Sequence, residues 1–150
     1  MKEGYEYMDY DLFLEQYNRR DTFSIRQGIR LTKLSYGYAE AKLDSCDKHM
    51  NLHNCAHGGI LFTLSDIAAG CCLSTKGQHC VTLSATINYI RPGFCGTLLA
   101  KAKSVKMGRQ IGISDVSVYD EDGNLVCTGT YTMMYKDRIA WLNSQEPSEV

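Results

Sequence analysis

A single acidic residue, Asp66, stands in the most apolar stretch of the chain, His57 to Thr75, which has no other Asp, Glu, Lys or Arg. Apolar residues recur there at steps of three and four, as on one helix face: Ile60, Leu64, Ile67, Ala68 and Cys71. Asp66 falls nearly opposite that face, among small or uncharged residues, which predicts a helix covered on every side. A buried carboxylate is costly unless its pKa shifts or it finds a partner. Asp66 is therefore a candidate functional residue, the alternative being a pair with an arginine across an interface.

His57, Gly58 and Gly59 lie where the predicted helix begins. Glycine N–H groups can approach a ligand closely, and a helix N-terminus adds free donors and partial positive charge. Such donors can hold a carbonyl oxygen as it becomes an oxyanion. A tight turn into the helix is the simpler interpretation of the glycine pair. His57 could orient or donate to a substrate, or could be purely structural.

Five possible metal ligands crowd the segment before the helix: Cys46, His49, His53, Cys55 and His57. Zinc accepts such ligands, and the three histidines have the spacing of one helix face. The segment contains no C-x-x-C pair, however, and has the composition of a loop. We therefore expect no metal site here.

Three cations lie at expected strand ends or turns: Arg91, Lys106 and Arg109. They could receive phosphate groups as point charges or as hydrogen-bonding forks. The alternative is that they are ordinary surface cations.

Composition sets the class of protein. A chain of 150 residues is most simply one domain, residues 1–150, and a net charge of −1 with scattered Lys and Arg argues against nucleic acid binding. The acidic, aromatic N-terminus does not resemble a signal peptide, and the apolar stretch holds Asp66 and several glycines, so no membrane span is expected. Seven cysteines without an export signal are typical of reduced thiols in a cytoplasm.

Periodicity predicts the remaining elements. A short helix is expected at about 9–18, followed by a loop over 44–56, the central helix and a polar tail from about 137 to 150 that Trp141 could anchor. Strands are expected at 23–34, 36–43, 80–90, 97–106, 111–119 and 125–135. In the strand 80–90, alternation places Val81, Leu83, Ala85, Ile87 and Tyr89 on one face, opposite Thr82, Ser84, Thr86 and Asn88.

The short links between these strands favour antiparallel neighbours. One sheet wrapped around one apolar helix covers that helix on one side only. The remaining face, with Asp66, needs another surface, and a second copy of the chain is the simplest source. The sequence therefore predicts at least a homodimer.

The pattern from Asn51 through His57-Gly58-Gly59 to Asp66 resembles the signature of the PaaI-like hotdog-fold thioesterases. Segments 81–83, 88–93, 107–109 and 120–123 resemble that family's following strand, glycine-arginine corner and hairpin, so that the likeness covers about residues 25–135. The resemblance implies an α+β hotdog fold, an antiparallel sheet around a central helix. It also implies dimers with a continuous sheet, which commonly pair again into a homotetramer.

The resemblance further implies an acyl-CoA thioesterase whose site straddles two subunits. Asn51, His57 and Gly58 would come from one chain, and Asp66 and Thr82 from the other. Asp66 would act as general base or nucleophile, and the Gly58 N–H would polarise the thioester carbonyl. The remaining roles fall to Asn51 and Thr82, which would position the attacking water or carboxylate, and to His57, which would contact the thioester or support its loop.

Coenzyme A would be part of the substrate, with no separate cofactor. Gly59 would line its site, and its phosphates would lie near Arg91, Lys106 or Arg109. The loop 52–56 lacks a Gly that relatives often have, and Asn54 could take the polar role of Asn51. Two alternatives stay open on the same fold: a dehydratase or hydratase, and a non-catalytic acyl-CoA-binding or sensor protein.

Overall fold

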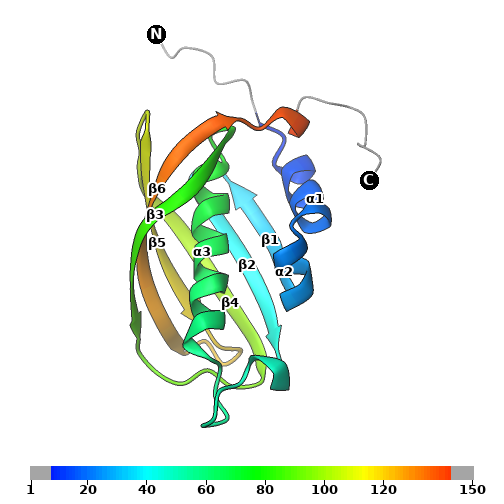
Figure 1. The fold of residues 1–150 in the computed structure, drawn as a ribbon, viewed down its shortest axis with the longest axis vertical. Helices are drawn as coiled ribbons and strands as arrows, with labels where there is room; N and C mark the ends of the chain where they lie inside the picture. Colours follow the sequence, from blue (N-terminus) through cyan, green and yellow to red (C-terminus); the bar gives the residue numbers. More distant parts are fainter. Residues whose placement is uncertain (1–7, 143–150) are drawn as a thin grey trace.

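The computed structural model describes residues 8–142 and shows an antiparallel sheet curled around one long helix (Figure 1). The helices are α1 (Tyr10–Arg20), α2 (Thr22–Gln27), the 3-10 turn η1 (Asp47–His49), α3 (Gly58–Ser74) and the 3-10 turn η2 (Ala140–Leu142). The strands are β1 (Ile29–Ser35), β2 (Tyr38–Ser45), β3 (Gln78–Tyr89), β4 (Gly96–Met107), β5 (Ile111–Tyr119) and β6 (Leu125–Arg138). They form one six-stranded sheet in the order β1-β2-β4-β5-β6-β3. The predicted α+β architecture is thus confirmed.

Small side chains allow α3 to lie close against the middle of the sheet. Ala39 and Ala41 of β2 pair in register with Ala102 and Ala100 of β4, and all four are fully buried. Leu64, Ala68 and other α3 residues pack onto this strip, and they too are wholly excluded from solvent. Close packing of this kind fixes the rotation of the helix about its axis. The opposite face of α3, with Asp66, is thereby held away from the sheet.

The N-terminal segment differs from the sequence prediction. Residues 22–27, expected to begin a strand, form α2, which ends at Gly28 in the left-handed conformation with φ 76°. Phe23 and Ile25 suggested strand alternation, yet both side chains are about half exposed. The prediction was wrong because the six residues of α2, fewer than two helical turns, are too few to show a helical period, while Phe and Ile favour strands. Glycine at the end of α2 is the helix-stop signal in the sequence.

The C-terminal end of the described chain is anchored rather than free. Strand β6 continues to Arg138, beyond the predicted 135, and Ile139 is buried. The Trp141 ring stacks at a tilt on Phe13 of α1, with ring centroids 5.3 Å apart. The predicted anchoring role of Trp141 is therefore confirmed, and the rest of the predicted tail, 143–150, lies outside the described residues. No helix in the described chain is both long and apolar enough to cross a membrane.

The two edges of the sheet are treated differently. At the β1 edge, the Asn18 side chain of α1 takes the place of a neighbouring strand. Its Nδ2 donates to the Leu31 carbonyl oxygen, and its Oδ1 accepts from the Leu31 N–H, both at 2.8 Å. At the β3 edge, Val81 and Leu83 are among several exposed apolar side chains. An open edge of this kind is a template for pairing with another strand, so β3, not β1, is the edge available to a second chain.

Replacing Asn18 by Ala is expected to lower the free energy of unfolding by about 1–3 kcal/mol, because it leaves the N–H and C=O of Leu31 without their partners. Urea denaturation followed by circular dichroism measures this loss. Gln16→Ala on the same helix removes a surface hydrogen bond to Arg20 and is the matched control, expected to change stability by less than about 0.5 kcal/mol. Equal stability of the two variants would contradict the role assigned to Asn18.

A bulge in β3 changes which side chains face α3. Thr82 pairs with Met133 of β6, but Ser84 pairs with the adjacent Thr132, so Leu83 is an extra residue. Before the bulge, even-numbered side chains reach α3, because Thr82 bonds to Asp66. After it, an odd-numbered one does, because Tyr89 bonds to Gly58. The predicted alternation, with Thr82 on the face opposite Tyr89, was therefore wrong, since one inserted residue reverses the pattern.

Candidate active site

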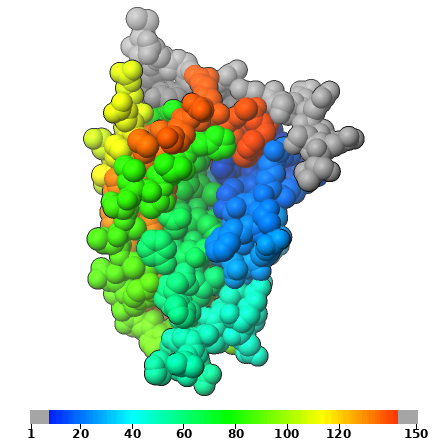
Figure 2. All heavy atoms as spheres, in the orientation of Figure 1, coloured from blue at the N-terminus to red at the C-terminus, as the bar shows by residue number. Residues whose placement is uncertain are grey.

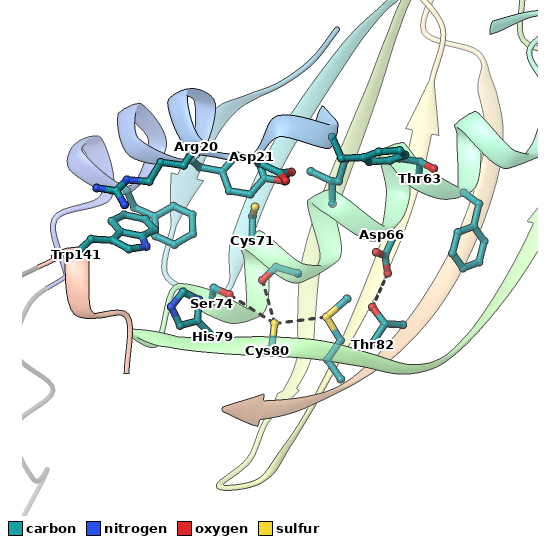
Figure 3. Close-up of a pocket in the computed structure, with 17 residues that line it drawn as sticks. Arg20, Asp21, Thr63, Asp66, Cys71, Ser74, His79, Cys80, Thr82 and Trp141 are labelled. Carbon is teal, nitrogen blue, oxygen red and sulfur yellow. Dashed lines mark hydrogen bonds between the residues drawn. The ribbon is translucent and has the colours of Figure 1, made fainter. Parts of the chain in front are cut away.

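A pocket of about 580 Å³ lies along α3, between the N-terminal helices and β3. In Figure 2 the surface of α3 forms the floor of a groove between β3 and the α1–α2 segment. Most of the lining is apolar or aromatic, including the rings of Phe13, Tyr17, Phe23, Phe62 and Trp141. Asp66 and Thr82 lie at the α3–β3 side of this pocket (Figure 3). Concave, mainly apolar pockets with a few polar groups are typical of small-molecule sites.

The Asp66 carboxylate is positioned by a hydrogen bond across the pocket wall. Thr82 Oγ1 donates to Asp66 Oδ1 at 2.6 Å, and the dashed line in Figure 3 marks this bond. Burial raises the pKa of Asp66 above its usual 3.8, and the Thr82 hydrogen bond partly opposes that rise. Over residues 8–142, the second carboxylate oxygen has no hydrogen-bond partner and Asp66 joins no ion pair. The alternative pairing with an arginine therefore has no support within the described chain.

The start of α3 is built by His57, Gly58 and Gly59 together. His57 is the N-cap residue, and its Nδ1 accepts from the Gly59 N–H at 2.9 Å. The ring proton of a neutral imidazole in this arrangement is on Nε2. The Gly59 N–H is thus already used, whereas the Gly58 N–H has no acceptor within the described residues. Gly58 is accordingly the better candidate for an oxyanion donor.

Both glycines have side-chain neighbours that leave little room for a Cβ. A Cβ at Gly58 would lie 3.1 Å from the Tyr89 ring, whose hydroxyl donates to the Gly58 carbonyl oxygen at 2.9 Å. A Cβ at Gly59 would lie 3.1 Å from the capping nitrogen of His57. Tyr89 was not among the predicted site residues. Its signal was present only as a strand-end aromatic, because the partner is 31 positions away in sequence.

Asn51 is engaged within its own loop. Its Oδ1 accepts from the backbone N–H of His53 at 2.8 Å and of Cys55 at 3.3 Å. Asn54 is exposed and has a positive φ of 58°, a conformation that asparagine adopts more readily than most residues. Both asparagines therefore have a structural role in shaping the turn before α3. Their parts in chemistry, Asn54 as a substitute included, stay predictions.

The possible metal ligands before α3 do not converge. His49 is buried; its Nδ1 accepts from the Cys46 N–H and its Nε2 lies 3.0 Å from the Gln27 carbonyl oxygen. His53 is exposed, and His57 caps α3. Across residues 8–142, no three His, Cys, Asp or Glu side chains gather as a metal site would need.

The three predicted phosphate-binding cations lie at opposite ends of the molecule. Arg91 follows β3 beside the start of α3, where the Ala56 N–H donates to the Gly93 carbonyl oxygen. Lys106 and Arg109 flank the β4–β5 hairpin at the other end, where Lys76 reaches the Gly108 carbonyl oxygen. The 17 residues of α3 that separate the two ends span about 25 Å. One chain therefore cannot bring all three to the same phosphate group.

The sheet and the helix that it wraps define the hotdog fold, and the Asp66 carboxylate on that helix fits the thioesterase class. The Thioesterase superfamily profile matches residues 53–127. Acyl-coenzyme A thioesterase PaaI of Escherichia coli is 32% identical over 100 residues, which are 66% of this chain and 71% of PaaI. The solved structure of E. coli PaaI aligns with a TM-score of 0.79 at 26% identity, over 83% of this chain and 91% of that one. The chain belongs to the Thioesterase superfamily.

Two streptococcal proteins add structural comparisons. The structure of smu.793 from Streptococcus mutans, bound to acetyl CoA, has a TM-score of 0.70 and 32% identity over 73% of this chain and 90% of its own. Two variants of a hypothetical thioesterase protein from Streptococcus pneumoniae have TM-scores of 0.70 and 0.69, each at 30% identity over 73% of this chain and 92% or 91% of their own. One variant replaces an aspartate by alanine, and the other a threonine sixteen positions later.

Proposed function

We propose that this protein hydrolyses acyl-CoA thioesters to a carboxylic acid and coenzyme A, with Asp66 as general base or nucleophile. The observation that carries the proposal is the Asp66–Thr82 pair, held at 2.6 Å in the wall of an apolar pocket. The name of PaaI and the acetyl CoA bound to smu.793 support the substrate class. The S. pneumoniae variants support the pair, because Asp66 and Thr82 are also sixteen positions apart.

The chemistry asks for few groups. As a base, Asp66 takes a proton from water while the water oxygen bonds to the thioester carbonyl carbon. The carbonyl oxygen becomes an oxyanion, and as it collapses the C–S bond breaks. The thiolate of coenzyme A leaves and takes up the proton from Asp66, which restores the carboxylate. Burial makes Asp66 a stronger base than an exposed Asp, which suits proton transfer near neutral pH. As a nucleophile, the Asp66 oxygen without a protein partner would attack the same carbon and displace the thiolate of coenzyme A. The resulting mixed anhydride would then be hydrolysed by water to the carboxylic acid and free Asp66.

We further infer that the site needs two chains. Gly58 and Asp66 are separated by eight residues of α3, which is about 12 Å along the helix axis. Two groups so far apart cannot both contact one thioester carbonyl, whose carbon and oxygen are directly bonded. A Gly58 N–H from a second chain, brought in at the open β3 edge, would supply the oxyanion donor. A homodimer is therefore the smallest active unit in this proposal, and a homotetramer stays a prediction.

Release of free thiol from acyl-CoA esters, followed with a chromogenic thiol reagent, tests the proposal. Turnover over a panel of short, long and aromatic acyl groups supports it. Binding of acyl-CoA without thiol release would favour a sensor protein instead. Loss of the conjugated double bond of crotonyl-CoA, again without thiol release, would favour a hydratase.

The pH profile gives a specific prediction for Asp66. A base must be ionised, so kcat/KM is expected to fall as the pH drops through the Asp66 pKa, at a midpoint above the ordinary value of 3.8. Thr82→Val removes the hydrogen bond that lowers this pKa, and is expected to move the midpoint to higher pH. Thr86→Val, at an exposed position of the same strand, should leave the midpoint in place. An unchanged midpoint in Thr82→Val would argue against Asp66 as the titrating group.

A further inference from the structure

A polar cluster interrupts the wall of the pocket at the junction of α1 and α2. Tyr17 Oη donates to Asp21 Oδ2 at 2.6 Å, Ser24 Oγ donates to the same oxygen, and the two hydroxyl oxygens lie 3.0 Å apart. Ser24 is buried, with 1% of its surface exposed. Tyr17 and Asp21 both line the pocket. Figure 3 shows Asp21 projecting from this junction above Cys71 of α3.

The Asp21 carboxylate does not cap helix α2, although Asp21 occupies the capping position. Asp21 is the N-cap residue of α2, where an aspartate normally accepts a backbone N–H of the first turn. Here its side chain makes no capping bond. Two hydroxyls hold Oδ2, and Oδ1 has no hydrogen-bond partner in the described part of the chain. The carboxylate is thus fixed in place with one acceptor oxygen unused.

Asp21 and the proposed catalytic residue Asp66 line the same pocket. Burial raises the pKa of the Cys71 thiol, and the nearby charge of Asp21, which lines the same pocket, adds to that rise. Cys71 is five residues beyond Asp66 on α3, which is about 7.5 Å along the helix axis. Asp66, Cys71 and Asp21 line one pocket, whose lining also includes apolar and aromatic groups such as Ile67 and Phe23. An acyl chain of medium length with its thioester at Asp66 would place its far end beside Asp21.

We propose that Asp21 is a specificity-determining residue, which accepts a hydrogen bond from a hydroxyl group at the far end of the acyl chain. This inference rests on the proposed thioesterase function and names its substrate class: thioesters of medium-length hydroxyacyl groups. An alkyl end of the same length would displace water from the Asp21 carboxylate without donating a hydrogen bond in its place. The hydroxyl group restores a charge-assisted hydrogen bond in a position that Tyr17 and Ser24 have already fixed.

Three thioesters of equal chain length test the assignment: heptanoyl-CoA, 6-hydroxyheptanoyl-CoA and 6-oxoheptanoyl-CoA. The wild-type protein is expected to hydrolyse the hydroxy compound with a kcat/KM about 10- to 100-fold above that of the other two, the usual range for one hydrogen bond to a charged group. Equal values for the hydroxy and unsubstituted compounds would overturn the assignment while leaving the thioesterase function intact.

Asp21→Asn replaces a hydrogen-bond acceptor facing the pocket by a donor, and the shape of the side chain is nearly unchanged. Its amide oxygen can keep the bonds from Tyr17 and Ser24, so that its NH₂ group faces the pocket as a donor. The preference is then expected to move from the hydroxy to the oxo compound. Asp11→Asn, at an exposed position of α1, should keep the wild-type preference. A hydroxy preference that persists in Asp21→Asn would also overturn the assignment.

A binding measurement separates this inference from the proposed function. Calorimetric titration of the Asp66→Asn protein with the hydroxy and unsubstituted compounds needs no turnover, and the hydroxy compound is expected to bind about 10-fold tighter or more. The same titration of the Asp21→Asn, Asp66→Asn double variant should show no such difference. If the wild-type protein releases no thiol from any compound, the proposed function is wrong. If the Asp66→Asn protein binds the hydroxy and unsubstituted compounds with equal affinity, the role assigned to Asp21 is wrong.

Discussion

Asp66→Asn is expected to lower kcat for acyl-CoA hydrolysis by about 1,000-fold, within the range that a positioned general base contributes. The amide keeps the shape of the side chain and can still accept the hydrogen bond from Thr82, so only the basic or nucleophilic oxygen is lost. Thiol release under saturating substrate measures the effect. A variant with more than a tenth of wild-type activity would remove Asp66 from the mechanism.

The structure supplies a matched control on the outer surface. Asp115 Oδ1 accepts a hydrogen bond from Thr130 Oγ1 at 2.7 Å, but this cross-strand pair is exposed and lies away from the pocket beside α3. Asp115→Asn therefore makes the same chemical change to a similar Asp–Thr pair. Activity is expected to stay within about 2-fold of wild type, since surface substitutions away from a site change little.

Asp66→Asn is expected to increase the stability of the protein although it lowers the activity. The pKa of Asp66 is raised in the folded protein, so between 3.8 and the folded pKa the native state binds more protons than the unfolded state. The free energy of unfolding contributed by this group therefore falls as the pH rises through that window. Above the folded pKa the ionised Asp66 destabilises the fold, and the neutral amide should raise the melting temperature measured there. Lost activity together with higher stability is typical of a group placed for chemistry.

The sequence predicted the elements that have a steady apolar period or clear turn signals at their ends. Strand β5 was predicted with the bounds it has, 111–119, and the central helix was predicted within one residue at each end, 57–75 against Gly58–Ser74. The apolar positions of the central helix keep one steady period, so local pattern and tertiary packing agree there. The bounds of β5 came instead from Gly108 before it and the turn 120–123 after it. Strand β4 was also predicted within one residue at either end, 97–106 against Gly96–Met107.

Elements that depend on distant partners could not be predicted in the same way. No glycine or proline in β3 marks the bulge at Leu83 in the sequence. Its effect can be recognised only in the structure, where Thr82 and Tyr89 both reach α3. Likewise the sequence ended the first helix at about residue 18 and gave no signal for the cluster of Tyr17, Asp21 and Ser24, because the place of this cluster in the pocket depends on how α1 and α2 pack beside α3. Asp66 could be recognised from sequence because its signal, one charge in an apolar helix, is local.

The role of the Gly58 N–H can be tested by comparing two variants that both add a Cβ at this position. Gly58 is the first residue of α3, a position that proline occupies readily because no intrahelical hydrogen bond is lost there. The preceding His57 has ψ 137°, within the range that a residue before proline prefers. Gly58→Ala and Gly58→Pro both add a Cβ near the Tyr89 ring, but only proline removes the N–H. Relative to Gly58→Ala, Gly58→Pro is expected to lower kcat by about 100-fold or more, as for other oxyanion donors.

Co-expression of two inactive variants then tests whether Gly58 and Asp66 act across a subunit boundary. A heterodimer of Gly58→Pro and Asp66→Asn chains has one site with both groups intact and one with both lost. Random pairing makes half of the dimers mixed, so about a quarter of wild-type activity is expected to return. If Gly58 and Asp66 of the same chain formed one site, every site in the mixed dimer would lack one group. Activity no higher than that of the separate variants would therefore contradict the two-chain site. Restored activity is expected, because Gly58 and Asp66 of one chain lie about 12 Å apart along α3 and a second chain must then supply the donor.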